Sequence, residues 1–260
     1  MILSSAVICS VGLRRPENQD NFYLNGSFRE DPHGKQTLRI TNTAVGTAVY
    51  AVADGMGGEM FGELASLEAV KNMSEINPDR IEKSFPEHLS KCNEEICKLI
   101  SANGGVRIGT TFVGICIKDS HALITNIGDS RLYIVRNGVL TQLSVDHSLV
   151  QQMVNSGIIT PDEARTHPDR HKITQHLGIF PEEMLIEPQY SWHTVQPGDI
   201  FLLCSDGLTD MVEDEVIRNI FTHSSLRKLP LSTKAEALHT AAMKAGGRDN
   251  CTVMLIEAKD

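Results

Sequence analysis

Residues 49–58 have the sequence VYAVADGMGG, in which five apolar residues run directly into an Asp-Gly turn. Short apolar runs that are bounded by glycine and aspartate are typical of buried β-strands. The same arrangement recurs at residues 200–207, where IFLLC is followed by Ser-Asp-Gly. Both stretches therefore predict a buried strand that ends beside an aspartate.

The neighbouring segments predict more strands and a pair of helices. Two helical stripes, Leu64–Met73 and Leu89–Leu99, follow residues 49–58 and are separated by Asn77-Pro78, which predicts an αα-hairpin. Asn137-Gly138 predicts a β-hairpin, because both residues tolerate positive φ. The expected strands are Ala6–Val11, Ala48–Ala53, Thr110–Ile117, Ala122–Ile127, Arg131–Val135, Val139–Leu143, Ile200–Cys204 and Cys251–Glu257.

A polar segment from about Asp146 to Ile179 holds four of the ten histidines and interrupts the strand series. We expect a surface flap there, with a capping box at Thr160–Glu163 and Trp192 packed at its base. A second capping box, Thr233 with Glu236, predicts the start of the last helix.

Strands and helices do not alternate regularly, which argues against a doubly wound parallel sheet. The predicted fold is α+β: a central β-sandwich of two mostly antiparallel sheets flanked by helical layers, with a flap insert at about residues 146–179. The chain shows no linker, internal repeat or low-complexity stretch, so residues 1–260 are expected to form a single domain.

Composition excludes several classes of protein. The 24 basic and 33 acidic residues give a formal net charge of −9, which argues against a nucleic-acid binder. No apolar stretch approaches the roughly 18–20 residues of a membrane span, and no basic residue precedes the apolar N-terminus, as it would in a signal peptide. The six scattered cysteines indicate reduced thiols. We expect a cytoplasmic protein that contacts neither nucleic acid nor membrane.

Five aspartates lie at the ends of the predicted strands, and four of them have a glycine within two residues. They are Asp20, Asp54, Asp129, Asp206 and Asp249. Carboxylates at a sheet edge form a hard-oxygen site that selects Mg²⁺ or Mn²⁺, and two such ions bind phosphate and ionise water for in-line attack. Any single Asp-Gly is more often a simple turn, so spacing alone leaves both interpretations open. A P-loop is excluded because GxxxxGK[ST] is absent.

Taken together, the motifs resemble the metal-dependent protein serine/threonine phosphatases, the type 2C or PPM family, in its bacterial form. The matching blocks follow the family order and span nearly the whole chain: Arg15 with Asn18-Gln19-Asp20, Ala53-Asp54-Gly55-Met56-Gly57-Gly58, Gly62-Glu63-Leu64-Ala65-Ser66, Gly109-Thr110-Thr111, Asn126 to Arg131, Asp146-His147-Ser148, Ser205-Asp206-Gly207-Leu208 and Gly247-Arg248-Asp249-Asn250.

The resemblance implies a centre of two Mn²⁺ or Mg²⁺ ions at one edge of the sandwich. The implied ligands are Asp54 bridging the ions, the Gly55 carbonyl, Asp20, Asp206 and Asp249, with Asp129 and Asp206 holding a weaker third ion. Arg15 corresponds to the arginine that binds the substrate phosphate, so Arg15 and Asp54 are the implied catalytic residues. Met56 replaces the histidine that is a proposed general acid in eukaryotic members, so no side-chain acid is expected there.

The implied activity is hydrolysis of phosphoserine and phosphothreonine by direct attack of a metal-bridging water, without a covalent phosphoenzyme. The expected partners of this monomer are a bacterial Ser/Thr kinase and its phosphoprotein targets. Two alternatives are a catalytically weak pseudophosphatase acting as a regulatory binding module, and an enzyme for small phosphorylated metabolites. The presence of Arg15 and the aspartates counts against the first.

Several other polar residues have plain structural explanations. Arg131 is expected either to bind phosphate or to form a salt bridge that fixes its turn. His147 is expected to make a structural hydrogen bond. His167 and His171, four residues apart in the polar flap, are expected to be exposed to solvent rather than to bind a metal.

Overall fold

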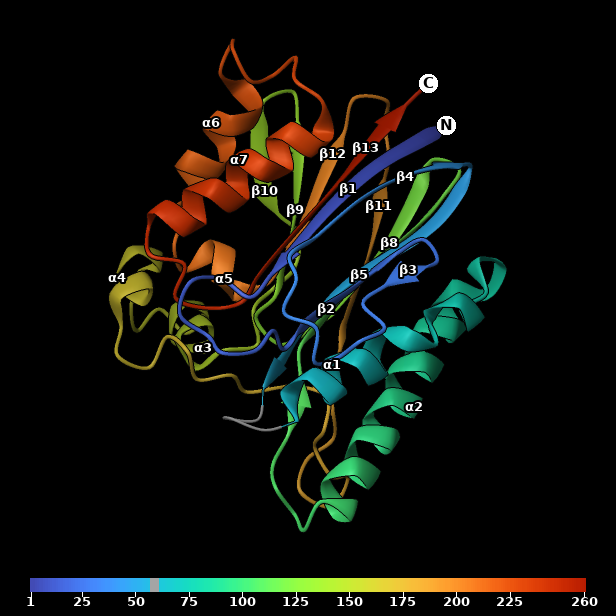
Figure 1. Cartoon of the computed structure of the whole chain (residues 1–260), viewed down its shortest axis with the longest axis vertical. Helices are drawn as coiled ribbons and strands as arrows, with labels where there is room; N and C mark the ends of the chain where they lie inside the picture. Colours follow the sequence, from blue (N-terminus) through green and yellow to red (C-terminus); the bar gives the residue numbers. More distant parts are fainter. Residues whose placement is uncertain (57–60) are drawn as a thin grey trace.

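The computed structural model describes residues 1–56 and 61–260, and its strands form two antiparallel sheets (Figure 1). The first, six-stranded sheet has the order β10 (Val139–Gln142), β9 (Arg131–Arg136), β12 (Ile200–Cys204), β13 (Cys251–Lys259), β1 (Ile2–Ser10) and β4 (Leu38–Val45). The second, seven-stranded sheet has the order β11 (Gln189–Thr194), β8 (His121–Ile127), β7 (Phe112–Lys118), β5 (Thr47–Met56), β2 (Asp20–Leu24) and β3 (Ser27–Phe28), with β6 (Gly109–Thr110) on the end of β5.

The two sheets pack face to face through alternate side chains of their inner faces. Val7 and Phe201 of the six-stranded sheet and Phe22 and Tyr50 of the seven-stranded sheet belong to this one apolar cluster. The predicted sandwich of antiparallel sheets is therefore confirmed.

Helices cover both outer faces of the sandwich (Figure 1). The seven-stranded sheet is covered by α1 (Gly62–Lys71) and α2 (Ile81–Ala102), which are linked by the short helices η1 (Met73–Glu75) and η2 (Pro78–Arg80). The six-stranded sheet is covered by α6 (Asp214–Thr222) and α7 (Leu231–Lys244). The predicted αα-hairpin is confirmed. None of the helices in the described ranges is long and apolar enough to cross a membrane.

The predicted flap region carries two short helices, α3 (Leu149–Asn155) and α4 (Pro161–Thr166), which lie beside α5 (Asp206–Thr209) in Figure 1. The Thr160–Glu163 capping box is present at the start of α4. A single β-bridge between Ser148 and Ile173 joins two parts of the flap to each other. A second, between Thr110 and Leu177, joins the flap to β6.

Two sequence-based expectations are wrong. Trp192 does not pack at the base of the flap: it lies on β11, is 50% exposed, and its indole N–H donates to Glu82 near the start of α2. The Thr233–Glu236 capping box is not formed, because α7 begins two residues earlier at Leu231. Glu236 instead pairs with Arg39 of β4.

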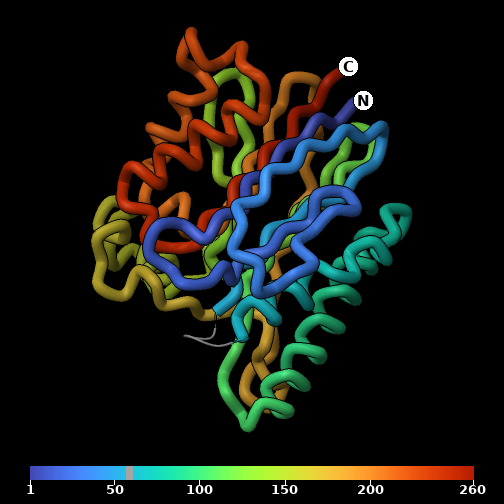
Figure 2. Tube along the Cα trace, in the orientation of Figure 1, coloured from blue at the N-terminus to red at the C-terminus, as the bar shows by residue number. Residues whose placement is uncertain are grey.

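The chain termini lie close together at one end of the sandwich (Figure 2), because β1 and β13 pair from Ile2 with Lys259 to Ser10 with Cys251. The other end of this strand pair adjoins the loops that carry the predicted aspartates. That end is where the candidate site lies.

Candidate metal centre

Strand register brings the first two aspartates together. Asp20 opens β2 and is paired directly with Asp54 near the end of β5. Side chains of directly opposed residues share one face of the sheet, with their Cβ atoms about 4.5–5.5 Å apart. Because Phe22 and Val52, two residues away on each strand, belong to the inner apolar cluster, both carboxylates face the space between the sheets.

The remaining aspartates reach the same place from other elements. Asp129 follows β8, Asp206 opens α5 directly beyond β12, and Asp249 precedes β13. A cleft of about 700 Å³ is lined by all three, together with Asp54, Gly55 and Arg15. The structure thus brings the predicted residues together at one end of the sandwich, with Asp20 buried beside this cleft rather than among its lining residues.

Asp20 is held in a way that leaves one carboxylate oxygen free. The residue has no exposed surface, and its Oδ2 accepts hydrogen bonds of 2.7 Å from both the Ser205 and Thr252 hydroxyls. Its Oδ1 is buried and accepts no hydrogen bond from any described residue. A buried polar atom without a partner is costly, and coordination of a cation would satisfy it. Asp20 therefore fits a divalent-ion ligand.

The carboxylates raise one another's pKa values. Burial, followed by the Asp20 and Asp206 charges, raises the pKa of Asp54 well above its usual value. Burial also raises the pKa of Asp206, and that of Asp20 to about 6 and of Asp129 to about 7. Carboxylates that share a site resist ionising together, and bound cations remove this penalty. The donor set consists of oxygen atoms, which suits Mg²⁺ or Mn²⁺.

Gly55 sits where no side chain fits. A Cβ there would lie 2.1 Å from the Gly62 carbonyl oxygen and 2.5 Å from that of Gln19. The Gly55 N–H donates to the Gln19 carbonyl at 3.1 Å, so the end of β5 rests directly on the segment that carries Asp20. Gly57 and Gly58 of the same motif lie outside the described residues.

Arg15 and Asp249 are joined across the cleft. The Arg15 Nη2 lies 2.6 Å from Asp249 Oδ2, and the arginine side chain is 48% exposed. Asn250 secures the loop that carries Arg15: its Oδ1 accepts from the Gln19 N–H, and its Nδ2 donates to the carbonyls of Val11 and Glu17. The loop between β1 and β2 is thereby fixed to the start of β13.

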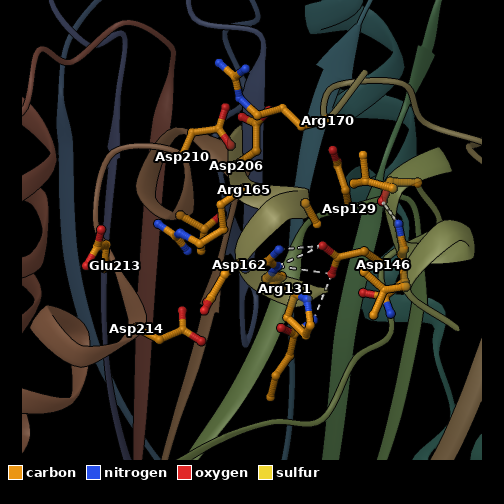
Figure 3. A pocket seen from close by; sticks show the side chains of 18 of the residues that line it. Asp129, Arg131, Asp146, Asp162, Arg165, Arg170, Asp206, Asp210, Glu213 and Asp214 are labelled. Carbon is orange, nitrogen blue, oxygen red and sulfur yellow. Dashed lines mark hydrogen bonds and ion pairs between the residues drawn. The ribbon is translucent and has the colours of Figure 1, made fainter. Parts of the chain in front are cut away.

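The flap side of the cleft opens into a second cavity of about 490 Å³, which shares Asp129, Arg170, Asp206 and Asp210 with the first (Figure 3). His171 is half exposed, as predicted, but its Nδ1 lies 3.2 Å from Asp210 Oδ2. No pattern in the sequence predicts this contact, since Asp210 precedes no glycine and ends no strand.

Two open questions about polar residues are resolved here. Arg131 is bound by Asp146 through contacts of 2.7–3.1 Å (Figure 3), which confirms the salt bridge, and it also donates to the Tyr133 hydroxyl. The His147 ring nitrogen accepts a hydrogen bond from the Gly128 N–H at 3.3 Å, which is the expected structural role. Both contacts fix the turn that carries Asp129.

Comparisons with known proteins agree with this geometry. Residues 21–241 match the family described as protein phosphatase 2C. Protein phosphatase PhpP of Streptococcus pneumoniae is 33% identical over 264 residues, covering 98% of this chain and 97% of that protein. The crystal structure of the Mycobacterium tuberculosis serine/threonine phosphatase PstP/Ppp has a TM-score of 0.82 at 29% identity, with all of both chains covered.

A further structure, the catalytic domain of the serine/threonine protein phosphatase PstP in complex with two manganese ions, has a TM-score of 0.77 at 28% identity and also covers both chains fully. The family match and the S. pneumoniae relative both span most of the chain, and the two structures share its fold. The chain therefore belongs to the protein phosphatase 2C family, as a bacterial serine/threonine protein phosphatase.

Proposed function

We propose that this phosphatase works with two Mn²⁺ or Mg²⁺ ions and a weaker third, and that it hydrolyses phosphoserine and phosphothreonine in proteins. The proposed ligands are Asp20, Asp54, the Gly55 carbonyl, Asp206, Asp249 and, for the third ion, Asp129 with Asp206. The observation that carries this proposal is the buried Oδ1 of Asp20, which has no hydrogen-bond partner among the described residues and lies beside a cleft where five more carboxylates meet. The family is metal-dependent.

When bound, such ions acidify a water molecule and neutralise charge on the phosphoryl group. The residues of the chain would hold the ions and orient the phosphoryl group for that chemistry. Arg15 is exposed in the cleft and is proposed to bind the phosphoryl oxygens, with Asp249 holding its guanidinium in place. Met56 lines the cleft and has no proton to donate, so no side-chain acid acts from this position.

The proposed substrates are proteins that a bacterial Ser/Thr kinase has phosphorylated. We propose that this chain dephosphorylates them as a monomer in the cytoplasm. Supporting this, the relatives bear the names of protein phosphatases. The two adjoining cavities between the flap and the sandwich also leave room for residues on either side of a phosphorylated side chain.

The test is release of phosphate from a phosphothreonine peptide in Mn²⁺, with and without EDTA, compared with a sugar phosphate. We expect turnover that EDTA abolishes, with the peptide as the faster substrate. Asp54→Asn should be inactive, whereas Asp79→Asn, at an exposed aspartate that contacts Lys118, should match the wild type. Absence of EDTA-sensitive turnover would indicate a pseudophosphatase, and faster hydrolysis of the sugar phosphate would indicate a metabolite enzyme.

A further inference from the structure

Arg29 is a buried arginine whose guanidinium, among the described residues, binds only main-chain atoms. It follows β3 and is 3% exposed, and no described carboxylate lies within ion-pair distance of it. Its five acceptors are all carbonyl oxygens: those of Asn18 (2.6 Å), Asp20 (3.1 Å), Asp31 (3.4 Å), Pro32 (2.9 Å) and Gly34 (3.2 Å). A buried charge is tolerated only when its donors are satisfied, and here the main chain satisfies them.

Two of these acceptors flank Gln19, in the segment that leads into the metal centre. Arg29 Nη2 holds the Asn18 carbonyl and Nε holds the Asp20 carbonyl. Gln19, between them, is fixed by its N–H to Asn250 and by its carbonyl to the N–H of Gly55. The guanidinium thus sets the course of the main chain from which the Asp20 carboxylate projects.

The β2–β3 hairpin has contacts of its own: its strands pair Tyr23 with Phe28 and Leu24 with Ser27. The Asn21 side chain adds two more contacts: its Oδ1 accepts from the Arg29 N–H and its Nδ2 donates to the Arg29 carbonyl, both at 3.0 Å. The Arg29 side chain extends beyond these hairpin contacts to the carbonyls of Asn18 and Asp20.

We propose that Arg29 is a positioning residue of the metal centre: its guanidinium fixes the main chain of residues 18–20 so that the Asp20 carboxylate presents its free oxygen to a divalent ion. The proposal rests on the metal-dependent function proposed above. It assigns to Arg29 an effect on ion affinity and on turnover, rather than on substrate binding.

The test is Mn²⁺ binding to the metal-free full chain, measured by calorimetry for Arg29→Met and Arg29→Lys. Loss of a group that orients a ligand typically weakens ion binding about 10–100-fold, and we expect such a loss for Arg29→Met. Arg29→Lys keeps the charge but lacks the planar fork, so its affinity should lie between those of Arg29→Met and the wild type. Arg39→Met, which removes an exposed arginine paired with Glu236, is the matched control and should bind like the wild type.

A purely structural role gives a different result. Arg29 variants would then melt at lower temperature, but their folded fraction would bind Mn²⁺ with wild-type affinity, which would overturn the proposal.

The second measurement is turnover of p-nitrophenyl phosphate by Arg29→Met at saturating Mn²⁺. We expect kcat to fall about tenfold while KM stays within about twofold. If Arg29→Met does not fold, unchanged affinity in Arg29→Lys is decisive against the proposal. A wild type that neither binds Mn²⁺ nor releases phosphate would refute the proposed function instead.

Discussion

At the scale of single residues, the aspartates of the site oppose stability in the metal-free protein. Burial and the neighbouring Asp129 charge raise the pKa of Asp206, so keeping it ionised in the folded state has a cost. Asp206→Asn should therefore raise the melting temperature in EDTA and abolish Mn²⁺-dependent turnover. Thermal unfolding and phosphate release measure the two effects, with Asp79→Asn as the exposed control. A lower melting temperature would show that Asp206 is needed for folding.

Arg15 is expected to contribute to binding of the phosphoryl group. Hydrogen bonds to charged groups contribute about 1.5–3 kcal/mol, so Arg15→Ala should lower kcat/KM for p-nitrophenyl phosphate by roughly 10–100-fold. Arg14 is the exposed neighbour and does not line the cleft, so Arg14→Ala is the matched control. Equal kinetics for Arg15→Ala and Arg14→Ala would remove Arg15 from the site.

The site residues that could be predicted were those with a recognisable pattern in the neighbouring sequence. Asp54 and Asp206 each follow an apolar run and precede a glycine, so their positions at strand ends were predictable. Thr252, which bonds Asp20 from 232 positions away, has no such signature. Arg29 likewise looks like an ordinary polar loop residue in the sequence. Its burial depends on carbonyl groups whose direction only the folded loop defines.

At the scale of elements, strands that form a continuous apolar run in the sequence were easier to predict than strands rich in polar residues. β12 is buried along its whole length and its bounds were predicted correctly as Ile200–Cys204. β4 and β11 consist mostly of intermediate and exposed residues and contain many polar side chains, so neither was predicted. β2 is buried but short and begins with Asp20-Asn21, and it was missed as well. Trp192 was misplaced for the same reason, because its strand was not recognised.

The flap is anchored to the sandwich by the Arg131–Asp146 pair, whose side chains are 25% and 7% exposed. Removing one partner of a buried ion pair costs about 3–5 kcal/mol, whereas an exposed pair contributes about 0–1 kcal/mol. Asp146→Ala should therefore lower the free energy of unfolding far more than Glu236→Ala, which breaks the exposed pair with Arg39. Urea denaturation in EDTA measures both, and similar losses would contradict a structural role for the buried pair.

At the scale of the whole molecule, the site exists only when the sandwich is closed. Asp20 and Asp54 lie on the seven-stranded sheet, Asp206 and Asp249 adjoin strands of the six-stranded sheet, and Asp129 lies in the turn that connects the two sheets. Ions bound between the sheets would bind the folded state alone and stabilise it by mass action. The sequence predicted both sheets and the order of most elements, but the strand order within each sheet depends on pairings between distant segments.

The metal-free protein should lose stability as the pH rises from about 4 to 7. Burial raises the pKa of Asp20 to about 6 and that of Asp129 to about 7, from a usual value of 3.8. The folded state thus holds these protons more tightly than the unfolded chain, and their contribution disappears as they dissociate. We expect a lower melting temperature in EDTA at pH 7.5 than at pH 5, and a larger stabilisation by Mn²⁺ at pH 7.5. A melting temperature in EDTA that rises over this range would contradict the buried acidic centre.

Aspartates from both sheets should form one divalent-ion centre, and titration of the metal-free chain with Mn²⁺ by calorimetry measures this binding. We predict two tight ions in the wild type, with a weaker third. Asp54→Asn should lose tight binding, and Asp129→Asn should keep two ions and lose the weak one. Wild-type stoichiometry and affinity in Asp54→Asn, or no Mn²⁺ binding to the wild type, would show that these aspartates do not form a metal centre.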